Sequence, residues 1–396
     1  MEAGHTAERP GEKKGLWKIL TLSGRMDLTF LVIVLVLLSI GLIMMFSASY
    51  AYAYYYKGNS LHYIARQLPF AALGVLVMLV ASKVDYRLFK VAVWPLYALS
   101  IALLIVVLFM PESNGARRWI FIGSEGSSVS FQPSEIVKFA VVILFAYLIV
   151  KYGPAKMRTT RYGVLPFAVL LAPIVFLMLK EPHLSGTVLI FLLAVVMLFI
   201  GGMHPGWFIA GAAGVVGIIF VVILNPDILT VFAHYAGKRI EVWLDPFSDP
   251  IDKGFQTIQS LYAIGSGGLM GTGIGGSRQK YLYLPEPYND FIFSIVCEEL
   301  GFVGATLVIC IFALLVWRGF VIAARCRDRF GALLAAGLTA QVGIQAILNI
   351  AVVTNTIPNT GISLPFFSYG GTSLLMLLGE MGVVLAVSRN ASIEKE

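Results

Sequence analysis

The stretch LPEPYNDF, residues 284–291, joins a long polar loop to a hydrophobic run that begins at Phe291. Its two prolines favour an extended approach to that run, and Asn289 or Asp290 is predicted to cap the helix that follows. A carboxylate at this point lies at the mouth of a membrane segment and faces whatever the loop encloses. Asp290 is therefore the leading candidate for a reactive group, while the alternative that Asp290 is only a helix cap stays open.

The composition is that of a polytopic membrane protein. The chain has 396 residues, of which 58% are hydrophobic and 13% charged, and its mean hydropathy is +0.84; no water-soluble globular domain has such values. The net charge of +7 comes mainly from short loops between apolar runs, which indicates membrane topology and no nucleic-acid partner. The three cysteines lie on or just after one hydrophobic segment, so no disulfide framework is implied.

Ten apolar runs are long enough to cross about 30 Å of hydrocarbon as helices. They predict an all-α integral membrane protein with a ten-helix domain over residues 28–388, an N-terminal tail (1–27) and a C-terminal tail (389–396). The basic N-terminus is read as a retained cytoplasmic tail, because it lacks a small-residue cleavage site. The runs lie near 28–47, 66–82, 92–110, 133–150, 164–180, 184–201, 207–225, 291–316, 331–352 and 372–387.

Lysine and arginine in the short loops set the orientation. With both termini cytoplasmic, the inner segments carry clusters of basic residues and the short outer loops carry few. The long loop of about 226–289, between the seventh and eighth helices, then lies outside the cytoplasm. The inner residues are Arg9, Lys13, Lys14, Lys18, Arg25, Lys83, Arg87, Lys90, Lys151, Lys156, Arg158, Arg161, Arg318, Arg325, Arg327 and Arg329.

The long loop is predicted to be ordered and functional, because it is rich in aromatic residues and in glycine. Residues 271–276 fit the pattern G-x-G-x-x-G, but a nucleotide site would need a strand before it and a helix after it in a soluble βαβ unit. A nucleotide is therefore rejected, and backbone amides that cradle a phosphate stay open. The sequence contains no zinc spacing, Walker motif or nucleophile elbow.

Three polar groups are predicted at membrane depth. Glu135 and Lys138 are an i, i+3 pair in the fourth run, and function is favoured over a local ion pair because ionisable groups are costly there. Of Glu298 and Glu299, at least one must face a partner, a cavity or a cation, with structural and catalytic roles equally open. Residues 355–373 are too polar and broken for a simple turn and predict a re-entrant segment packed against protein.

Together these stretches resemble the SEDS family of bacterial cell-wall polymerases, FtsW, RodA and SpoVE. The resemblance covers nearly the whole chain from Asp27 to Ser388, and residues 46–49 and 364–371 look closer to the FtsW and SpoVE branch than to RodA. It is carried by residues 115–120, 132–138, 245–254, 259–276, 284–286, 290–301 and 364–373. One stretch departs: EPHLSG (181–186) stands where relatives commonly show Gln-Pro-Asp-Leu-Gly, so His183 replaces an acid and Ser185 a glycine.

The resemblance implies a peptidoglycan glycosyltransferase in the bacterial cytoplasmic membrane, with its active site facing outward. It implies lipid II as substrate, a class B penicillin-binding protein as partner, and other divisome or sporulation membrane proteins nearby. It places the essential carboxylate at Asp290 and carries basic residues needed for activity onto Arg118 and Lys138. The full set expected to bind substrate is Arg118, Lys138, Glu135, Trp243, Gln259, Ser260, Gly267, Gly268, Lys280, Glu286, Ser368 and Tyr369.

The expected mechanism is a single displacement. Asp290 accepts the proton of the acceptor's GlcNAc 4-hydroxyl, which attacks the donor's MurNAc with inversion, and undecaprenyl pyrophosphate leaves. No tightly bound cofactor is expected, and a divalent cation, Mg²⁺ or Mn²⁺, remains open without assigned ligands. Two rival hypotheses are a lipid II transporter, which buried charges and glycine-broken helices also fit, and a scaffold for a penicillin-binding protein. The absence of an inverted repeat counts modestly against the transporter.

Overall fold

The computed structural model describes residues 24–112, 117–122, 129–181, 183–224, 242–251 and 254–391. Most of the N-terminal tail, the first part of the long loop and the end of the C-terminal tail lie outside these residues. Within them, every apolar run expected to cross the membrane forms a helix. The helices are α2 (Leu28–Lys57), α3 (His62–Ala81), α4 (Phe89–Val107), α5 (Pro133–Met157), α6 (Thr160–Gly163), α7 (Leu165–Lys180), α8 (Leu184–Ile200), α9 (Pro205–Leu224), α12 (Phe255–Gly267), α13 (Ile292–Arg325), α14 (Arg329–Val353) and α15 (Gly371–Ser388).

Eight membrane-crossing candidates are found among the described residues by length and hydropathy. The protein is therefore a multi-pass membrane protein. The eight include neither α8, an apolar helix below the length used for a crossing, nor α9. The count of ten crossings accordingly stays a prediction. Several helices are longer than predicted; α2 extends to Lys57, α5 to Met157 and α13 to Arg325.

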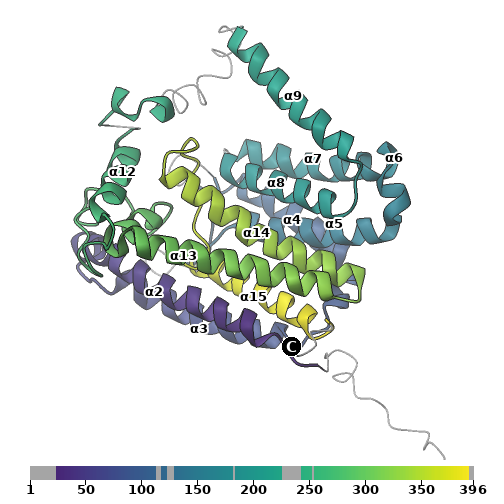
Figure 1. Ribbon diagram of the computed structural model, residues 1–396, viewed down its shortest axis with the longest axis horizontal. Helices are drawn as coiled ribbons and strands as arrows, with labels where there is room; N and C mark the ends of the chain where they lie inside the picture. The colour runs from purple at the N-terminus through teal and green to yellow at the C-terminus, as the bar shows by residue number, and fades with distance from the viewer. Residues whose placement is uncertain are drawn as a thin grey trace, which may run out of the picture.

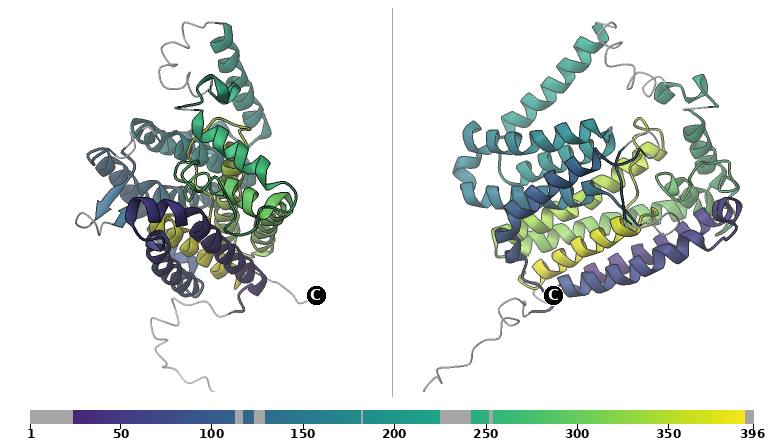
Figure 2. Two further views of the ribbon diagram at one scale, coloured as in Figure 1. Left: turned by 90° about the vertical axis from the view of Figure 1, so that its left-hand side faces the viewer. Right: turned by 180° about the vertical axis from the view of Figure 1, so that it is seen from behind.

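The helices form two groups that meet at α14 (Figure 1). On one side α13 and α15 pack with α2 and α3; on the other, α5 and α8 pack with α4 and α7. The helix α9 leans away from both groups, which the view from behind also shows (Figure 2). Because α14 contacts both groups, it is buried on most of its faces.

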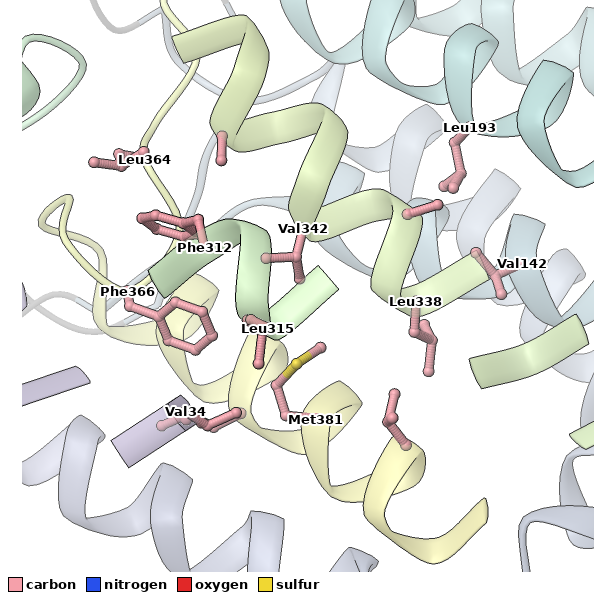
Figure 3. Packing of buried hydrophobic residues seen from close by; sticks show 14 of the residues in the cluster. Val34, Val142, Leu193, Phe312, Leu315, Leu338, Val342, Leu364, Phe366 and Met381 are labelled. Carbon is pink, nitrogen blue, oxygen red and sulfur yellow. The ribbon is translucent and has the colours of Figure 1, made fainter. Parts of the chain in front are cut away.

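Small residues let α14 occupy this central position. A Cβ atom at Gly337 would lie 2.5 Å from the Met197 sulfur of α8 and 2.6 Å from a Val142 methyl of α5, so glycine permits close approach of the three helices. On the other side, Leu338 and Val342 of α14 share the apolar core with residues of α13 and α15 (Figure 3). Phe366 of the loop before α15 extends this core toward Phe312, at 6.4 Å between ring centres.

The long helix α13 is broken at Gly301, and the glycine-rich loop fills the break. Gly301 has a positive φ of 68°. The freed amides of Phe302 and Val303 donate to the carbonyl oxygens of Gly268 and Leu269. In return, the amides of Thr272 and Gly273 donate to the carbonyl oxygens of Glu298 and Glu299, which the break leaves without helical partners.

This exchange decides the role of the G-x-G-x-x-G stretch. The amides of Gly271, Thr272 and Gly273 all donate to main-chain carbonyls, so they do not form a free cradle for phosphate. A Cβ atom at Gly271 would overlap the carbonyl oxygen of Glu299. Gly271 is therefore explained by close packing on α13, and Gly273 and Gly275 by positive φ angles of 88° and 83°.

Among the described residues, a short antiparallel hairpin departs from the all-α prediction. Strands β1 (Ile120–Ile122) and β2 (Val129–Phe131) pair with Phe121 opposite Ser130. The hairpin is tied to the bundle by Thr372 of α15, whose hydroxyl donates to the Ser130 carbonyl oxygen at 2.8 Å. It brings the residues just before β1 and just after β2 to the end of the bundle.

Candidate active site

A polar cavity of about 440 Å³ lies where this hairpin, the first turns of α5, α8 and α15, and the loops before α13 and α15 converge. Segments far apart in the sequence thus meet at one end of the bundle. Seven of the residues predicted to form the site line it: Asp290, Arg118, Glu135, Lys138, Glu286, Ser368 and Tyr369.

Asp290 is held through its main chain. The side-chain amide of Asn349, fully buried in α14, donates to the carbonyl oxygen of Asp290 at 2.7 Å and to that of Ile362 at 2.6 Å. A Cβ atom at Gly361 would lie only 3.0 Å from the Asp290 carboxylate. The glycine therefore leaves room for the carboxylate between the two loops.

The predicted capping role of Asn289 or Asp290 is wrong. The N-cap of α13 is Phe291, and α13 has no side-chain cap. The Asn289 amide instead donates to Glu286 at 2.9 Å, because the turn before α13 continues through Phe291. The Asp290 carboxylate does not cap the helix and instead lines the cavity.

Burial and the neighbouring Glu286 charge raise the pKa of Asp290, and Arg118 partly opposes them, so that the pKa is about 6. A carboxylate with this pKa is ionised at neutral pH yet basic enough to accept a proton. These are the properties of a general base.

Ser368 and Tyr369 fasten the segment that carries Asp290. The Ser368 hydroxyl donates to the Asn289 carbonyl oxygen at 2.8 Å and accepts from the Leu364 amide at 2.7 Å. The Tyr369 amide donates to the Tyr288 carbonyl oxygen at 2.9 Å. Both residues line the cavity, but the Ser368 hydroxyl is engaged with the main chain.

Glu135 and Lys138 form an ion pair of 2.9 Å on the cavity wall. The Lys138 ammonium also donates to the Gln345 side-chain oxygen at 3.2 Å. The Gln345 amide in turn reaches the Ser363 carbonyl oxygen at 3.0 Å. The local ion pair, which was the alternative to a functional role, therefore exists, and it also lies on the cavity wall.

Arg118 reaches the cavity from the residues just before β1. Its positive charge lowers the pKa of both Asp290 and Glu181. It also lowers the pKa of His183. Arg118 therefore lies between the loop that carries Asp290 and the connection from α7 to α8.

The other predicted residues lie away from the cavity. The Trp243 indole donates to the Asn355 carbonyl oxygen at 3.0 Å. The Ser260 hydroxyl, fully buried, bonds Ser294 and the Val353 carbonyl oxygen, each at 2.8 Å. Gln259, Gly267 and Gly268 belong to α12 and its C-terminal end, and a Cβ atom at Gly267 would overlap the Cys297 carbonyl oxygen.

Lys280 is buried in a separate charged network. Its ammonium lies 2.9 Å from Glu299 and 3.1 Å from the Ser47 hydroxyl of α2. Glu298 accepts from the Ser277 hydroxyl at 2.5 Å and from the Arg278 amide at 2.8 Å. Both glutamates thus have protein partners, and this network ties the long loop to α2 and α13.

Sequence reasoning missed several polar residues of the site. Gln132, Ser134, Gln345 and Ser363 line the cavity, and Asn349 supports it. The sequence held a signal for Gln345 and Asn349. With Gln341 they recur every four residues in an apolar run and so lie on one face of a helix.

A resident metal has no evident ligand set in the described part of the chain, where no group of three or more His, Cys, Asp or Glu side chains is placed to hold an ion. A cation carried in by a phosphate-bearing substrate needs no such group, so the open prediction of Mg²⁺ or Mn²⁺ is unaffected.

Comparison with known proteins identifies the family. The family model of cell cycle proteins named for FtsW, RodA and SpoVE matches residues 27–393. This chain belongs to the FtsW/RodA/SpoVE family.

Among curated relatives of the FtsW/RodA/SpoVE family, stage V sporulation protein E of Bacillus subtilis is 41% identical over 85% of this chain and 89% of its own. A probable peptidoglycan glycosyltransferase FtsW of Geobacter sulfurreducens is 38% identical over 83% of this chain and 86% of its own.

Solved structures of the family agree with the fold. A chain from a structure that describes polymerization and crosslinking by a peptidoglycan synthase complex has a TM-score of 0.74 and 29% identity, covering 93% of this chain and 99% of its own. The rod shape determining protein RodA of Thermus thermophilus has a TM-score of 0.66 and 26% identity, covering 93% of this chain and 98% of its own.

Proposed function

We propose that this chain is a peptidoglycan glycosyltransferase that polymerises lipid II into glycan strands. The observation that carries the proposal is the polar cavity, where one carboxylate with a raised pKa lies among cations in a chain of the FtsW/RodA/SpoVE family. The naming of FtsW relatives as probable peptidoglycan glycosyltransferases supports it.

In the proposed reaction Asp290 is the general base. Its carboxylate accepts the proton of the acceptor's GlcNAc 4-hydroxyl while that oxygen forms a bond to the anomeric carbon of the donor's MurNAc. The bond from this carbon to the pyrophosphate oxygen breaks, and the electron pair leaves with undecaprenyl pyrophosphate. One displacement inverts the α-linked donor to a β-linked product. General-base assistance of this kind typically contributes about 100-fold to 10,000-fold.

The leaving pyrophosphate develops negative charge, which Arg118 and Lys138 on the cavity wall are suited to stabilise. Lys138 is partly neutralised by Glu135. A divalent cation, Mg²⁺ or Mn²⁺, bound to the pyrophosphate would supply further positive charge there. Of the other residues predicted to bind substrate, those outside the cavity are expected to act by supporting the fold.

The proposal places the cavity at the outer face of the bacterial cytoplasmic membrane. With ten crossings and a cytoplasmic N-terminus, every segment that lines the cavity falls at the outer end of a helix. A class B penicillin-binding protein is the proposed partner, and the likeness to a chain of a peptidoglycan synthase complex supports it. The SpoVE and FtsW relatives favour a role in sporulation or division.

The test is polymerisation of labelled lipid II by the purified protein, with and without its class B partner. Glycan strands are expected, with β-linked products and no covalent glycosyl-enzyme. Trapping such an intermediate would contradict the single displacement. Absence of strands under every condition, together with translocation of lipid II in liposomes, would assign the chain to lipid II transport instead.

A further inference from the structure

One corner of the cavity, lined by His183 and Ser185, adjoins buried polar atoms that have no described hydrogen-bond partner. The Glu181 side-chain oxygen Oε1, the His183 ring nitrogen Nδ1 and the Ser185 hydroxyl make no hydrogen bond to any described residue. The exposed fractions of these three side chains are 1%, 6% and 2%. Buried polar atoms normally have partners, so three such atoms within five residues indicate a ligand or water that completes them.

The same corner is the N-terminus of a helix. α8 begins at Leu184, and its N-cap His183 makes no side-chain cap hydrogen bond. Thr187 provides the first amide bonded to a helical carbonyl, that of His183, at 3.1 Å. The earlier amides of a first turn, with the helix dipole, favour an anion at this position. Ser185 and Gly186 of this turn line the cavity.

The charges at this corner also favour an anion. Burial, with the nearby charges of Arg118 and Lys138, lowers the pKa of His183 to about 3, so its ring is neutral. Burial raises the pKa of Glu181 to about 8, so this carboxyl is mostly protonated at neutral pH. The charges that act on His183 are those of Arg118 and Lys138, and Lys138 is paired with Glu135 at 2.9 Å.

His183 is fixed in place on both sides. Its Nε2 lies 3.3 Å from the Gln132 amide nitrogen. Its ring lies against Gly186, where a Cβ atom would be only 2.6 Å from the ring carbon Cε1. The imidazole therefore forms a neutral wall beside the first turn and adds no negative charge there.

We propose that the first turn of α8, with the Ser185 hydroxyl as a donor, is a subsite for a phosphate oxygen of the donor's pyrophosphate. The proposal rests on the proposed function and deepens it by naming the leaving-group subsite. The Arg118 charge acts on both His183 and Asp290. A leaving group at the α8 turn would be bound on a different element from the base, which fits an inverting displacement, where the two act on opposite faces of the anomeric carbon. Two of the three departures of residues 181–185 from Gln-Pro-Asp-Leu-Gly fit this role, because His183 removes an acid and Ser185 adds a hydroxyl. The third, Glu181, places a carboxyl where relatives have an amide, and burial keeps that carboxyl mostly protonated.

The test measures binding of radiolabelled undecaprenyl pyrophosphate to the purified full-length protein, with undecaprenol as the uncharged competitor. In Ser185→Ala the dissociation constant for the pyrophosphate is expected to rise at least about tenfold, as for the loss of one hydrogen bond to a charged group. Undecaprenol affinity should stay unchanged. The matched control is Ser100→Ala, a buried serine of α4 whose hydroxyl bonds the Tyr97 carbonyl oxygen outside the cavity.

Two further variants guard against misfolding. Ser185→Gly also lacks the hydroxyl and should weaken pyrophosphate binding similarly. His183→Asp keeps the Ser185 hydroxyl but adds a negative charge beside it, and should weaken pyrophosphate binding as well. Wild-type affinity for pyrophosphate in folded Ser185→Ala and His183→Asp would overturn the subsite, since a bound water would then explain the partnerless atoms. Because binding needs no turnover, a protein that binds pyrophosphate through Ser185 yet forms no glycan would contradict only the proposed polymerase.

Discussion

Asp290 owes its proposed reactivity to neighbours that hold its main chain and leave its carboxylate facing the cavity. Asn349 bonds its carbonyl oxygen, and Ser368 bonds that of Asn289. Neither bond uses the carboxylate. Its charge is instead tuned by burial, by Glu286 and by Arg118. The proposed role of Asp290 therefore depends on the proton affinity of its carboxylate.

The first prediction concerns pH. Above a pH of about 6 Asp290 is ionised and can accept a proton. Polymerisation should therefore fall as pH drops through 6, by about tenfold for each unit below. Glu286→Gln removes a negative neighbour, which lowers the pKa of Asp290, so the inflection should move to lower pH. The measurement is the rate of lipid II consumption from pH 4.5 to 8; an inflection that Glu286→Gln leaves in place would exclude Asp290 as the titrating base.

At the scale of elements, the break in α13 connects the long loop to the membrane helices. Gly301 opens the helix, and the turn after α12 exchanges four hydrogen bonds with the exposed backbone. Beside it, the buried Lys280 ammonium donates to Glu299 and to the Ser47 hydroxyl, which connects α2 to the same joint. This joint holds the end of α13 that follows Asp290.

The second prediction is that Gly301→Ala destabilises the protein. Its φ of 68° suits glycine, and a Cβ atom there would overlap the backbone nitrogen of Gly271. A cost of at least about 1–3 kcal/mol is expected. The control is Gly265→Ala in α12, where a Cβ atom meets nothing within 4 Å and alanine should be neutral or slightly stabilising. Thermal unfolding in detergent compares them, and equal melting temperatures would refute the joint.

The third prediction separates support from substrate binding at Lys280. Lys280→Met leaves Glu299 buried without its cationic partner. The Ser47 hydroxyl and the Ser277 amide are then its only donors among the described residues, and loss of one member of a buried ion pair typically costs about 3–5 kcal/mol. Lys90→Met removes a more exposed pair, 3.6 Å from Asp328, and should cost about 1 kcal/mol or less. Chemical denaturation measures both. A Lys280→Met protein of full stability with a raised KM for lipid II would restore Lys280 to the substrate site.

How much the sequence could predict differs between these elements. Apolar runs located the eight helices that qualify as membrane crossings among the described residues, because burial in lipid demands a continuous apolar surface. Glu135 and Lys138 were found because ionisable groups at membrane depth are rare, Asp290 because it precedes a membrane run, and Arg118 through the family resemblance. Lys280 and Ser260 looked similar in sequence, yet their partners, Glu299 and Val353, come from other helices. Only the packing of α12 on α13 and α14 reveals that their polar atoms are engaged.

At the scale of the whole molecule, the connectivity and the cavity agree with each other. The predicted ten alternating crossings would bring the β1–β2 hairpin, the α7–α8 connection and the loops before α13 and α15 to one end. The cavity lies at that end. An even number of crossings between β2 and residue 290 is required for this arrangement, and α8 and α9 must therefore both cross or both stay on one side.

The fourth prediction tests that topology. In a background without native cysteines, His204→Cys, in the exposed turn between α8 and α9, should be shielded from a membrane-impermeant maleimide added to intact cells. Asn59→Cys, between α2 and α3, should react, and Lys83→Cys, between α3 and α4, should not. Reaction of His204→Cys from outside would show that α8 does not cross.

The most direct test of the account compares lipid II polymerisation by wild type and by Asp290→Asn, each purified with the class B partner. The asparagine keeps the size of the side chain, and the carboxylate makes no described hydrogen bond that folding would lose, so the melting temperature should be preserved. Glycan formation should fall by about 100-fold or more, while binding of undecaprenyl pyrophosphate stays within a few-fold. Glycan strands made at the wild-type rate by Asp290→Asn would contradict the assignment of Asp290 as the catalytic base.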